Sequence, residues 1–351
     1  MKKLKIVQLA PLWEPVPPKK YGGIEIMIKA LTEELVKRGH QVTLFATGNS
    51  KTKAKLNAVF PKSLLEEKVE WHHRSQNLIN AANAFKYADK FDLIHNHAGD
   101  NALFFTDICE TPVLTTLHNV LPDPKNYNSD EYITFKYYAR KTNFASISFN
   151  QRTHTNLKLN YVDNVYNGID INNFTFNKKP KDYLVWLGRI HYGKGMWNAV
   201  SVAKKSKQKL IAAGGVTCET DKEYLESVQP MIDGKRIKYL GEVSSREKNK
   251  LLGNARALLF PAIWEEPFGL VMIEAMACGT PVIAFDKGAV PEVIKHGKTG
   301  FVVKNEKEMI KAIGKIDQIN RADCREHIEN NFTVEKMVDG YERIYEKIMK
   351  D

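Results

Sequence analysis

Residues 257–285 carry the pattern that most restricts how this chain can fold. An apolar, strand-like run, Ala257–Pro261, leads into a loop that contains Pro267-Phe268-Gly269. An apolar run with helical character follows, and Gly279-Thr280-Pro281 ends it before a second strand-like run, Val282–Phe285. A strand, a helix and another strand in this order predict a unit whose two strands lie parallel in one sheet.

Two acidic residues of this unit stand eight positions apart. Glu266 falls in the loop at the carboxyl end of the first strand, and Glu274 lies on the helix, roughly 8 Å along it from Gly269 at about 1.5 Å per residue. A nucleotide sugar placed along the helix start could meet Glu266 at its sugar and Glu274 at its ribose. The N–H groups of Phe268, Gly269 and Leu270 would then face a phosphate, assisted by the helix dipole. A bare pair at this spacing is usually two solvated acids, and the surrounding unit is what favours a ligand site.

This segment resembles the E-x7-E signature of retaining GT-B glycosyltransferases, in particular glycosyltransferase family 4, and similar segments cover nearly the whole chain. The resemblance implies an α/β protein with two Rossmann-like domains whose parallel sheets face an interdomain cleft. Residues 1–168, joined by a C-terminal helix at 333–351, would form the acceptor domain, and residues 169–332 the donor domain. The implied activity moves a hexosyl unit from a nucleotide sugar, UDP-linked by preference or GDP-linked, to an acceptor hydroxyl of a glycan, lipid or small molecule.

Alternation of strand-like and helix-like segments along all 351 residues supports a parallel α/β architecture. The opening unit is the clearest, with a strand at Lys5–Ala10, a helix at about Ile24–Arg38 and a strand at Gln41–Ala46. Further expected elements are strands at Phe91–Ile94, Val113–Leu117, Ser146–Ser148, Tyr183–Gly188, Lys209–Ala213 and Ile237–Leu240, and helices at Met196–Lys205, Arg246–Asn254 and Phe332–Lys350. The turn-rich stretch Val165–Asp182, which includes the hinge-like Asn167–Asp170, fits a connector between domains.

The loop Gly188–Gly195 places two cations after the first strand of the second half. Arg189 can bind oxygens bidentately and Lys194 supplies a compact charge, which suits a diphosphate, although such a run taken alone is usually a surface loop. The resemblance assigns this pair to the donor diphosphate. Since the chain contains no Asp-x-Asp, these cations and a helix terminus are expected to replace a metal ion, and neither a metal nor a cofactor is expected.

Tyr21-Gly22-Gly23 lies between the first strand and its helix. Glycine N–H groups can approach a ligand closely, while the absence of G-x-G-x-x-G gives little support to a dinucleotide site. A plain turn is the simplest interpretation. The resemblance makes Gly22 and Gly23 part of the loop facing the donor, from which Glu25 could reach an acceptor.

Two histidines follow expected strands. His118 ends the run Val113–Leu117, at the carboxyl edge where such sheets bind ligands, and resembles the family's active-site histidine, which hydrogen-bonds the transferred sugar. The family often has an acid two residues later, whereas Asn119-Val120 follow here, so an acid-supported role is not expected. His97 belongs to an H-x-H pair without a carboxylate or cysteine to complete a metal set, so it is interpreted as structural or acceptor-facing.

The loop after Ile237–Leu240 looks like the family's base-reading loop, in which Glu242 and Val243 would contact the nucleotide. No residue stands out as a dedicated nucleophile, unlike the two carboxylates of retaining glycosidases. The expected route is therefore front-face substitution, in which the leaving diphosphate helps to deprotonate the acceptor. The alternatives are a sugar-nucleotide epimerase on the same fold and a catalytically silent sugar-nucleotide subunit.

A net charge of +11 could attract an anionic donor, attract an anionic membrane face or maintain solubility. Basic clusters lack the interleaved aromatics of nucleic-acid modules, so no nucleic-acid partner is expected. Four scattered cysteines suit reduced thiols, and no apolar run approaches the roughly 18 residues of a membrane span. We expect a cytoplasmic protein that contacts the inner membrane face peripherally, if at all.

Overall fold

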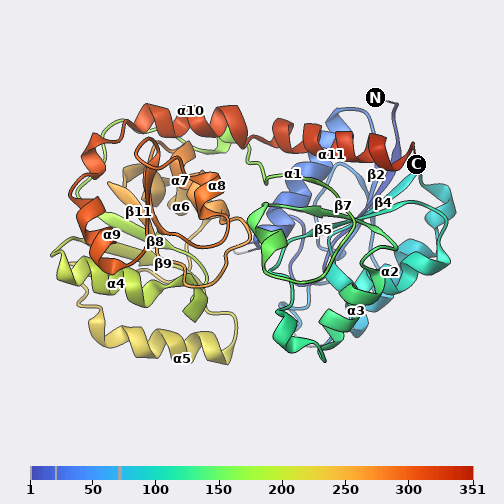
Figure 1. Ribbon diagram of the computed structural model, residues 1–351, viewed down its shortest axis with the longest axis horizontal. Helices are drawn as coiled ribbons and strands as arrows, with labels where there is room; N and C mark the ends of the chain where they lie inside the picture. Colours follow the sequence, from blue (N-terminus) through green and yellow to red (C-terminus); the bar gives the residue numbers. More distant parts are fainter. Residues whose placement is uncertain (1, 20–21, 70–72, 351) are drawn as a thin grey trace. The chain divides into compact units, whose positions relative to one another are not determined.

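The computed structural model describes residues 2–19, 22–69 and 73–350, and the chain divides into two compact units. Unit 1 comprises Met1–Gly168 together with Val334–Asp351, and unit 2 comprises Ile169–Thr333 (Figure 1). Tyr21 of the glycine loop and residues 70–72 lie outside the described residues. Each unit contains one sheet of parallel strands, which confirms the expected α/β class with two parallel sheets.

In the described part of unit 1, seven strands form a parallel sheet in the order β3-β2-β1-β4-β5-β6-β7. They are β1 (Lys5–Leu9), β2 (Gln41–Phe45), β3 (Lys55–Asn57), β4 (Leu93–Asn96), β5 (Val113–Leu117), β6 (Asn143–Ser146) and β7 (Tyr161–Asn164). The central strands are buried on both faces because helices cover both, and Ile6, Val7 and Leu9 of β1 are all inaccessible to solvent.

The helices of unit 1 lie on opposite faces of this sheet. They are α1 (Gly23–Lys37), α2 (Ser75–Phe85), α3 (Asp130–Tyr138) and α11 (Val334–Ile348), with 3-10 segments η1 (Ala88–Lys90), η2 (Gly99–Ile108), η3 (Pro124–Asn126) and η4 (Asn150–Thr153). Helix α11 packs along α1 and reaches β7, while α2 and α3 both contact η2 on the other side (Figure 1). The helix expected at Phe332–Lys350 is confirmed by α11, and its Tyr341, Ile344 and Tyr345 are buried.

One expected strand of unit 1 was misplaced. The sequence predicts a strand at Ser146–Ser148, whereas β6 spans Asn143–Ser146. The reason is local. The Ile147 N–H donates to the Gln151 side-chain oxygen, and the Ser148 hydroxyl accepts from the Gln151 N–H, so both residues bond to the segment that follows instead of to a neighbouring strand.

In the described part of unit 2, six strands form a parallel sheet in the order β10-β9-β8-β11-β12-β13. They are β8 (Leu184–Leu187), β9 (Leu210–Ala213), β10 (Ile237–Tyr239), β11 (Ala257–Phe260), β12 (Val282–Phe285) and β13 (Gly300–Val303). The unit predicted from residues 257–285 is confirmed, because β11 and β12 pair in parallel with Leu258 opposite Val282.

Helices cover both faces of this second sheet as well. They are α4 (Met196–Lys205), α5 (Glu219–Val228), α6 (Ser245–Asn254), α7 (Leu270–Ala277), α8 (Val290–Val293), α9 (Glu306–Ile313) and α10 (Arg321–Asn331), with η5 (Ile171–Asn173), η6 (Tyr192–Lys194), η7 (Gln229–Met231) and η8 (Ile316–Gln318). Helices α4 and α9 pack together on one face, and α7 packs with α6 and α10 on the other (Figure 1).

Candidate functional site

The candidate donor residues of unit 2 come together because all strands of its sheet are parallel. The loops that follow β8, β9, β10, β11 and β12 therefore lie at one edge of the sheet, the carboxyl edge, where α/β proteins bind ligands. Backbone hydrogen bonds tie these loops to one another: Gly214 N–H donates to the Gly241 carbonyl, and Ile263 N–H donates to the Gly193 carbonyl.

The centre of this edge is a compact cluster around Glu266. The Nζ of Lys194 lies 2.6 Å from Glu266 Oε2, and the indole Nε1–H of Trp264 donates to the same oxygen at 2.8 Å. The Lys194 ammonium also lies 4.6 Å from the centroid of the Trp264 ring. Within the described residues Glu266 Oε1 accepts no hydrogen bond from protein, so one carboxylate oxygen remains able to accept from a ligand hydroxyl.

The backbone that presents Lys194 is held tightly. Its carbonyl accepts a hydrogen bond from the buried indole of Trp186 at 3.1 Å, and the following Gly195 adopts a left-handed conformation with φ of 71°. A Cβ on Gly195 would lie 1.9 Å from the Pro261 carbonyl oxygen. Only glycine therefore allows the loops after β8 and β11 to approach this closely, and the approach is what brings Lys194 to Glu266.

Arg189 is anchored by an acid that the sequence analysis missed. Its Nε and Nη2 donate to the two carboxylate oxygens of Asp221, at 2.8 and 3.2 Å. Burial alone would raise the pKa of Asp221, but the bonds from Arg189 and Thr217 outweigh it and lower that pKa below its usual value. Asp221 stands on the first turn of α5, and no local signal linked it to Arg189. The Nη1 of Arg189 donates to no acceptor within the described residues, so it is free to bind an anion.

The start of α7 has the geometry expected of an anion-binding terminus. Gly269 is the N-cap residue in the left-handed region, with φ of 85°. The N–H groups of Gly269 and Leu270 have no acceptor in the part of the chain that the structure describes. The Phe268 side chain is buried, with its ring centroid 5.9 Å from that of Phe332, so its ring faces the core. Any ligand contact of Phe268 would therefore come from its backbone.

Glu274 lies on α7 and is 5% exposed. Its carboxylate forms an ion pair with Lys248 of α6. This burial rules out a solvated helix acid. Lys248 is a partner that sequence reasoning missed, since the pair joins two helices that are separated by a strand along the chain.

The loop after β10 presents the two residues expected to read a base. Gly241 adopts a φ of 70°, and Tyr239 directly before the turn donates its hydroxyl to the Gly214 carbonyl at 2.7 Å. Glu242 is exposed and Val243 is half-buried, so both are accessible at the carboxyl edge.

In unit 1 the two candidate histidines lie in contact. His118 Nε2 is 2.9 Å from His97 Nδ1, and the other ring nitrogen of His97 is 2.7 Å from the Gln8 side-chain oxygen. Both ring nitrogens of His97 therefore have partners inside the protein, which favours the structural interpretation of His97 over the acceptor-facing one. Burial lowers the pKa of His118 to about 4, so its imidazole is neutral at physiological pH.

Gly22 and Gly23 of unit 1 follow β1 and precede the body of α1, at the same edge of the sheet as His118. A Cβ on Gly22 would lie 2.7 Å from Cβ of Pro18 and 2.9 Å from Oε2 of Glu25, so no larger residue fits at this position. Gly23 is the first residue of α1. Glu25 in the first turn is only 4% exposed, and burial raises its pKa to about 7.

The raised pKa of Glu25 predicts that its contribution to the free energy of unfolding depends on pH. The folded-state pKa lies above the unfolded value, so the protonated Glu25 favours folding at low pH and this contribution is lost as the pH rises through 7. We expect Glu25→Gln to increase the free energy of unfolding at pH 8 by up to about 3 kcal/mol and to leave it nearly unchanged at pH 4. Urea unfolding at both pH values measures the difference, and an equal effect at both would contradict it.

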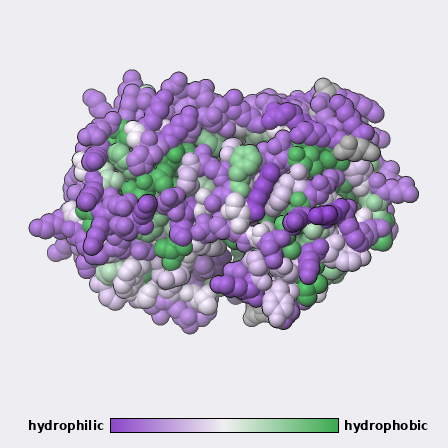
Figure 2. Space-filling model, viewed as in Figure 1, coloured by the Kyte–Doolittle hydropathy of each residue, from purple (hydrophilic) through white to green (hydrophobic). Residues whose placement is uncertain are grey.

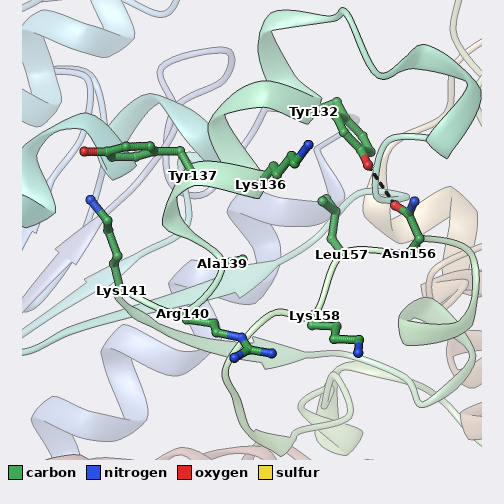
Figure 3. Close-up of a pocket in the computed structure, with 9 residues that line it drawn as sticks. All are labelled: Tyr132, Lys136, Tyr137, Ala139, Arg140, Lys141, Asn156, Leu157 and Lys158. Carbon is green, nitrogen blue, oxygen red and sulfur yellow. Dashed lines mark hydrogen bonds between the residues drawn. The ribbon is translucent and has the colours of Figure 1, made fainter.

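A basic depression lies elsewhere on unit 1 (Figure 3). It has a volume of about 500 Å³ and is lined by the end of α3 and the segment that leads into β7. Lys136, Arg140 and Lys158 form no ion pair within the described residues, while Lys141 pairs with Asp107 at 3.1 Å. These segments precede β6 and β7, so the depression lies toward the amino edge of the sheet, opposite His118. It is distinct from the candidate site.

Two further properties concern the described residues as a whole. No three His, Cys, Asp or Glu side chains among them are grouped so that they could hold a metal ion. No helix formed by these residues has the length and apolar character needed to cross a membrane. Hydrophilic side chains predominate on the face shown in Figure 2, in keeping with the charge content of the sequence.

Comparison with known proteins agrees with this arrangement. Residues 169–332 match the family model described as glycosyl transferases group 1, and residues 21–173 match the one described as glycosyltransferase family 4. The chain is 25% identical to the N-acetyl-alpha-D-glucosaminyl L-malate synthase of Bacillus anthracis over 374 residues, covering 94% of this chain and 95% of the relative.

Solved structures show the same fold. The sucrose-phosphate synthase of Thermosynechococcus elongatus superposes with a TM-score of 0.82 at 19% identity, covering 99% of this chain and all of that one. Anabaena Alr3699/HepE, solved in complex with UDP and glucose, superposes with a TM-score of 0.76 at 18% identity, covering 98% of this chain and all of that one. With its two parallel sheets, its matched domain models and its GT-B relatives, the chain belongs to glycosyltransferase family 4 and is an enzyme that transfers a sugar from a nucleotide sugar.

Proposed function

We propose that this enzyme moves a hexosyl unit from UDP-sugar, or less readily GDP-sugar, to an acceptor hydroxyl, with retention of the anomeric configuration and without a metal ion. Residues 169–332 would bind the donor, and residues 1–168 with the helix in 333–351 would bind the acceptor. The observation that carries the proposal is the cluster of Lys194, Trp264 and Glu266 at the carboxyl edge of unit 2. It combines the fixed positive charge of Lys194 with a carboxylate oxygen, Glu266 Oε1, that accepts no hydrogen bond from the described residues. The crystal structure of HepE with UDP and glucose supports UDP as the nucleotide.

Charge stabilisation explains how this cluster could act. As the bond between the sugar C1 and the phosphate oxygen breaks, negative charge grows on the leaving diphosphate. Lys194, the free Nη1 of Arg189 and the N–H groups of Gly269 and Leu270 would hold that charge. The acceptor oxygen forms its bond to C1 on the same face, and its proton passes to the departing phosphate oxygen. Glu266 would orient the sugar by accepting from one of its hydroxyls through Oε1.

The remaining candidates take positions around the donor. Glu274, held by Lys248, would accept from the ribose hydroxyls, and the backbone of Glu242 and Val243 would contact the base. In unit 1, Gly22 and Gly23 would face the diphosphate, His118 would hydrogen-bond the transferred sugar, and Glu25 would lie toward the acceptor. An intact set of charged groups in unit 2 argues against a catalytically silent subunit.

The proposal is tested by donor binding followed by product analysis. Thermal-shift screening against UDP, GDP, ADP and their sugars is expected to show the largest stabilisation with a UDP-sugar. Transfer should persist in EDTA, because protein cations take the place of a metal. The anomeric proton of the product, measured by NMR, should show the configuration of the donor. Loss of activity in EDTA that manganese restores, or an inverted product, would contradict the proposal.

We also propose that the enzyme works in the cytoplasm and that the basic depression of Figure 3 contacts an anionic membrane face. Lys136, Arg140 and Lys158 supply cations that form no ion pair within the part of the chain that the structure describes. The side chains of Ile133 and Tyr137, also on α3, are more than half exposed. The four unpaired cysteines fit a reducing compartment.

Vesicle binding tests the membrane proposal. We expect co-sedimentation with vesicles rich in phosphatidylserine and weak binding to neutral phosphatidylcholine vesicles. Combining Lys136→Gln with Arg140→Gln should weaken binding roughly 30-fold, at about 1 kcal/mol per cation. Lys209→Gln combined with Lys222→Gln removes two exposed lysines from unit 2 and serves as the control. Equal binding by both double variants would contradict the assignment of this surface.

A further inference from the structure

Beneath His118, a continuous chain of buried polar side chains crosses unit 1 and ends on the C-terminal helix. It joins strands β1, β4 and β5 to α11 through seven side chains, in the order His118, His97, Gln8, Tyr345, His95, Thr116 and Tyr341. All of these except His118, which is half-buried, are less than 5% exposed. A chain of this length in a core has a high cost unless every member is paired, and here each link has a partner within 3.4 Å.

The Gln8 amide determines which atoms donate and which accept in the hydrogen bonds between Gln8, His97 and His118. Its oxygen faces His97 Nε2 at 2.7 Å, and since an amide oxygen only accepts, His97 must carry its proton on Nε2. A neutral His97 then has a bare Nδ1, which accepts from His118. His118 therefore carries its proton on Nε2, and its Nδ1 is left as an acceptor without a partner among the described residues.

The hydrogen bonds between Gln8 and α11 follow the same donor-to-acceptor order. The Gln8 amide nitrogen donates to the Tyr345 hydroxyl at 3.4 Å, which leaves that hydroxyl to donate to His95 Nδ1 at 2.7 Å. His95 then donates from Nε2 to the Thr116 hydroxyl at 2.7 Å. Thr116 in turn donates to Tyr341 at 3.2 Å. Each of the six links thus has one donor and one acceptor, and the order of protons is the same from His118 to Tyr341.

This order requires that all three histidines are neutral. Burial lowers the pKa of His95 and His97 well below the usual value, and the neighbouring imidazoles lower both further. None of the seven side chains carries a charge. Glu342, which pairs with Arg38 and His40, acts on Tyr345, where it raises the pKa of the phenol further and so favours the neutral hydroxyl.

We propose that His97 is a positioning residue, and that the chain anchored on α11 holds His118 as the Nε2–H tautomer so that Nδ1 accepts a hydrogen bond from a hydroxyl of the transferred sugar. This inference rests on the proposed function for the contact with sugar, but the tautomer itself belongs to the free enzyme. It predicts a donor specificity: the transferred sugar must carry a hydroxyl that can donate to His118 Nδ1. A donor sugar with hydrogen or fluorine there cannot donate to His118.

Two tyrosines of α11 provide a matched pair of variants. Tyr345 stands in the middle of the chain, whereas Tyr341 is its last member, and both are almost inaccessible to solvent. Tyr345→Phe removes the hydroxyl that orients the Gln8 amide, so the amide can rotate and both proton orders become accessible. Tyr341→Phe makes the same chemical change on the same helix but removes only the terminal acceptor, which leaves the order near His118 intact.

The experiment combines NMR on protein labelled with ¹⁵N-histidine and steady-state kinetics. In wild-type enzyme without ligand, the ¹⁵N shifts of His118 should report the Nε2–H tautomer, and Tyr341→Phe should leave them unchanged. Tyr345→Phe should give mixed tautomers and lower kcat about 10-fold, with the KM for donor changed by less than about twofold, as expected when one buried hydrogen bond loses its orientation. Tyr341→Phe should keep kcat within about twofold of wild type.

The outcomes separate this inference from the proposed function. A wild-type His118 protonated on Nδ1, or identical tautomers in both variants, would overturn the chain whatever the activity. If the tautomers of His118 respond as expected but kcat is unchanged in Tyr345→Phe, the positioning role of His97 is overturned. If wild-type enzyme moves no hexose from any nucleotide sugar while the tautomers respond as expected, the proposed function fails and the tautomer assignment stands.

Discussion

Glu266→Gln is expected to lower kcat by about 10²–10³ while the Kd for the nucleotide diphosphate changes by less than about threefold. The amide keeps the size of the side chain and can still accept from the Trp264 indole, but it removes the negative charge that pairs with Lys194 at 2.6 Å. Under the proposed function it also weakens the acceptor for a sugar hydroxyl. Initial transfer rates and calorimetric titration with UDP measure the two effects separately.

The neighbouring acid supplies the control for this variant. Glu265 lies in the same loop, with its carboxylate bonded to Lys287 and to the Gly288 N–H at 3.2 and 2.7 Å. Glu265→Gln preserves an acceptor for Gly288 and should leave kcat within about threefold of wild type, since a partly exposed ion pair contributes little. Turnover that is unchanged in Glu266→Gln, or equally reduced in both variants, would remove Glu266 from its proposed position.

Lys194→Met is expected to lower kcat by about 10²–10³ and, unlike Glu266→Gln, to weaken binding of UDP about 10-fold. Methionine keeps most of the aliphatic length of lysine but has no ammonium group, so the ion pair with Glu266 and the cation–π contact with Trp264 are lost together. Uridine, which lacks the diphosphate, should bind wild type and variant alike. Titrations with UDP and uridine therefore report whether Lys194 contacts the phosphates.

A double variant separates two explanations of that loss. Lys194→Met leaves the Glu266 carboxylate buried without its cation, and this alone would perturb the site. Combining Lys194→Met with Glu266→Gln removes the unpaired charge. If Lys194 serves only as the partner of Glu266, the double variant should regain UDP affinity, and this recovery would contradict a diphosphate role. Lys287→Met, a loss of charge on the adjacent loop, should bind UDP as wild type does.

The arrangement of strands could be predicted from local pattern. The apolar run Ala257–Pro261, the stop at Gly279-Thr280-Pro281 and the run Val282–Phe285 predict a parallel pair, which β11 and β12 form. Such patterns are reliable because burial on both faces of a parallel sheet requires continuous apolar runs, and because glycine and proline interrupt helices for steric reasons. Where a side chain competes for the backbone, as Ser148 does beside β6, the strand boundary shifts.

The sequence by itself determined the α/β class, the family and the positions from which candidate groups such as Glu266 and Lys194 project, because these depend on residue order and strand direction. Only the tertiary structure decided their partners. Asp221 anchors Arg189, and Lys248 neutralises Glu274, across separations that no local period encodes. His97 is the clearest case. Tyr345, near the carboxyl end of the sequence, bonds to the Gln8 amide, and Gln8 and His118 bond to the two ring nitrogens of His97. Neither nitrogen is therefore left for a ligand. Hydrogen-bond partners in a core are set by which elements pack together, and that depends on the whole chain.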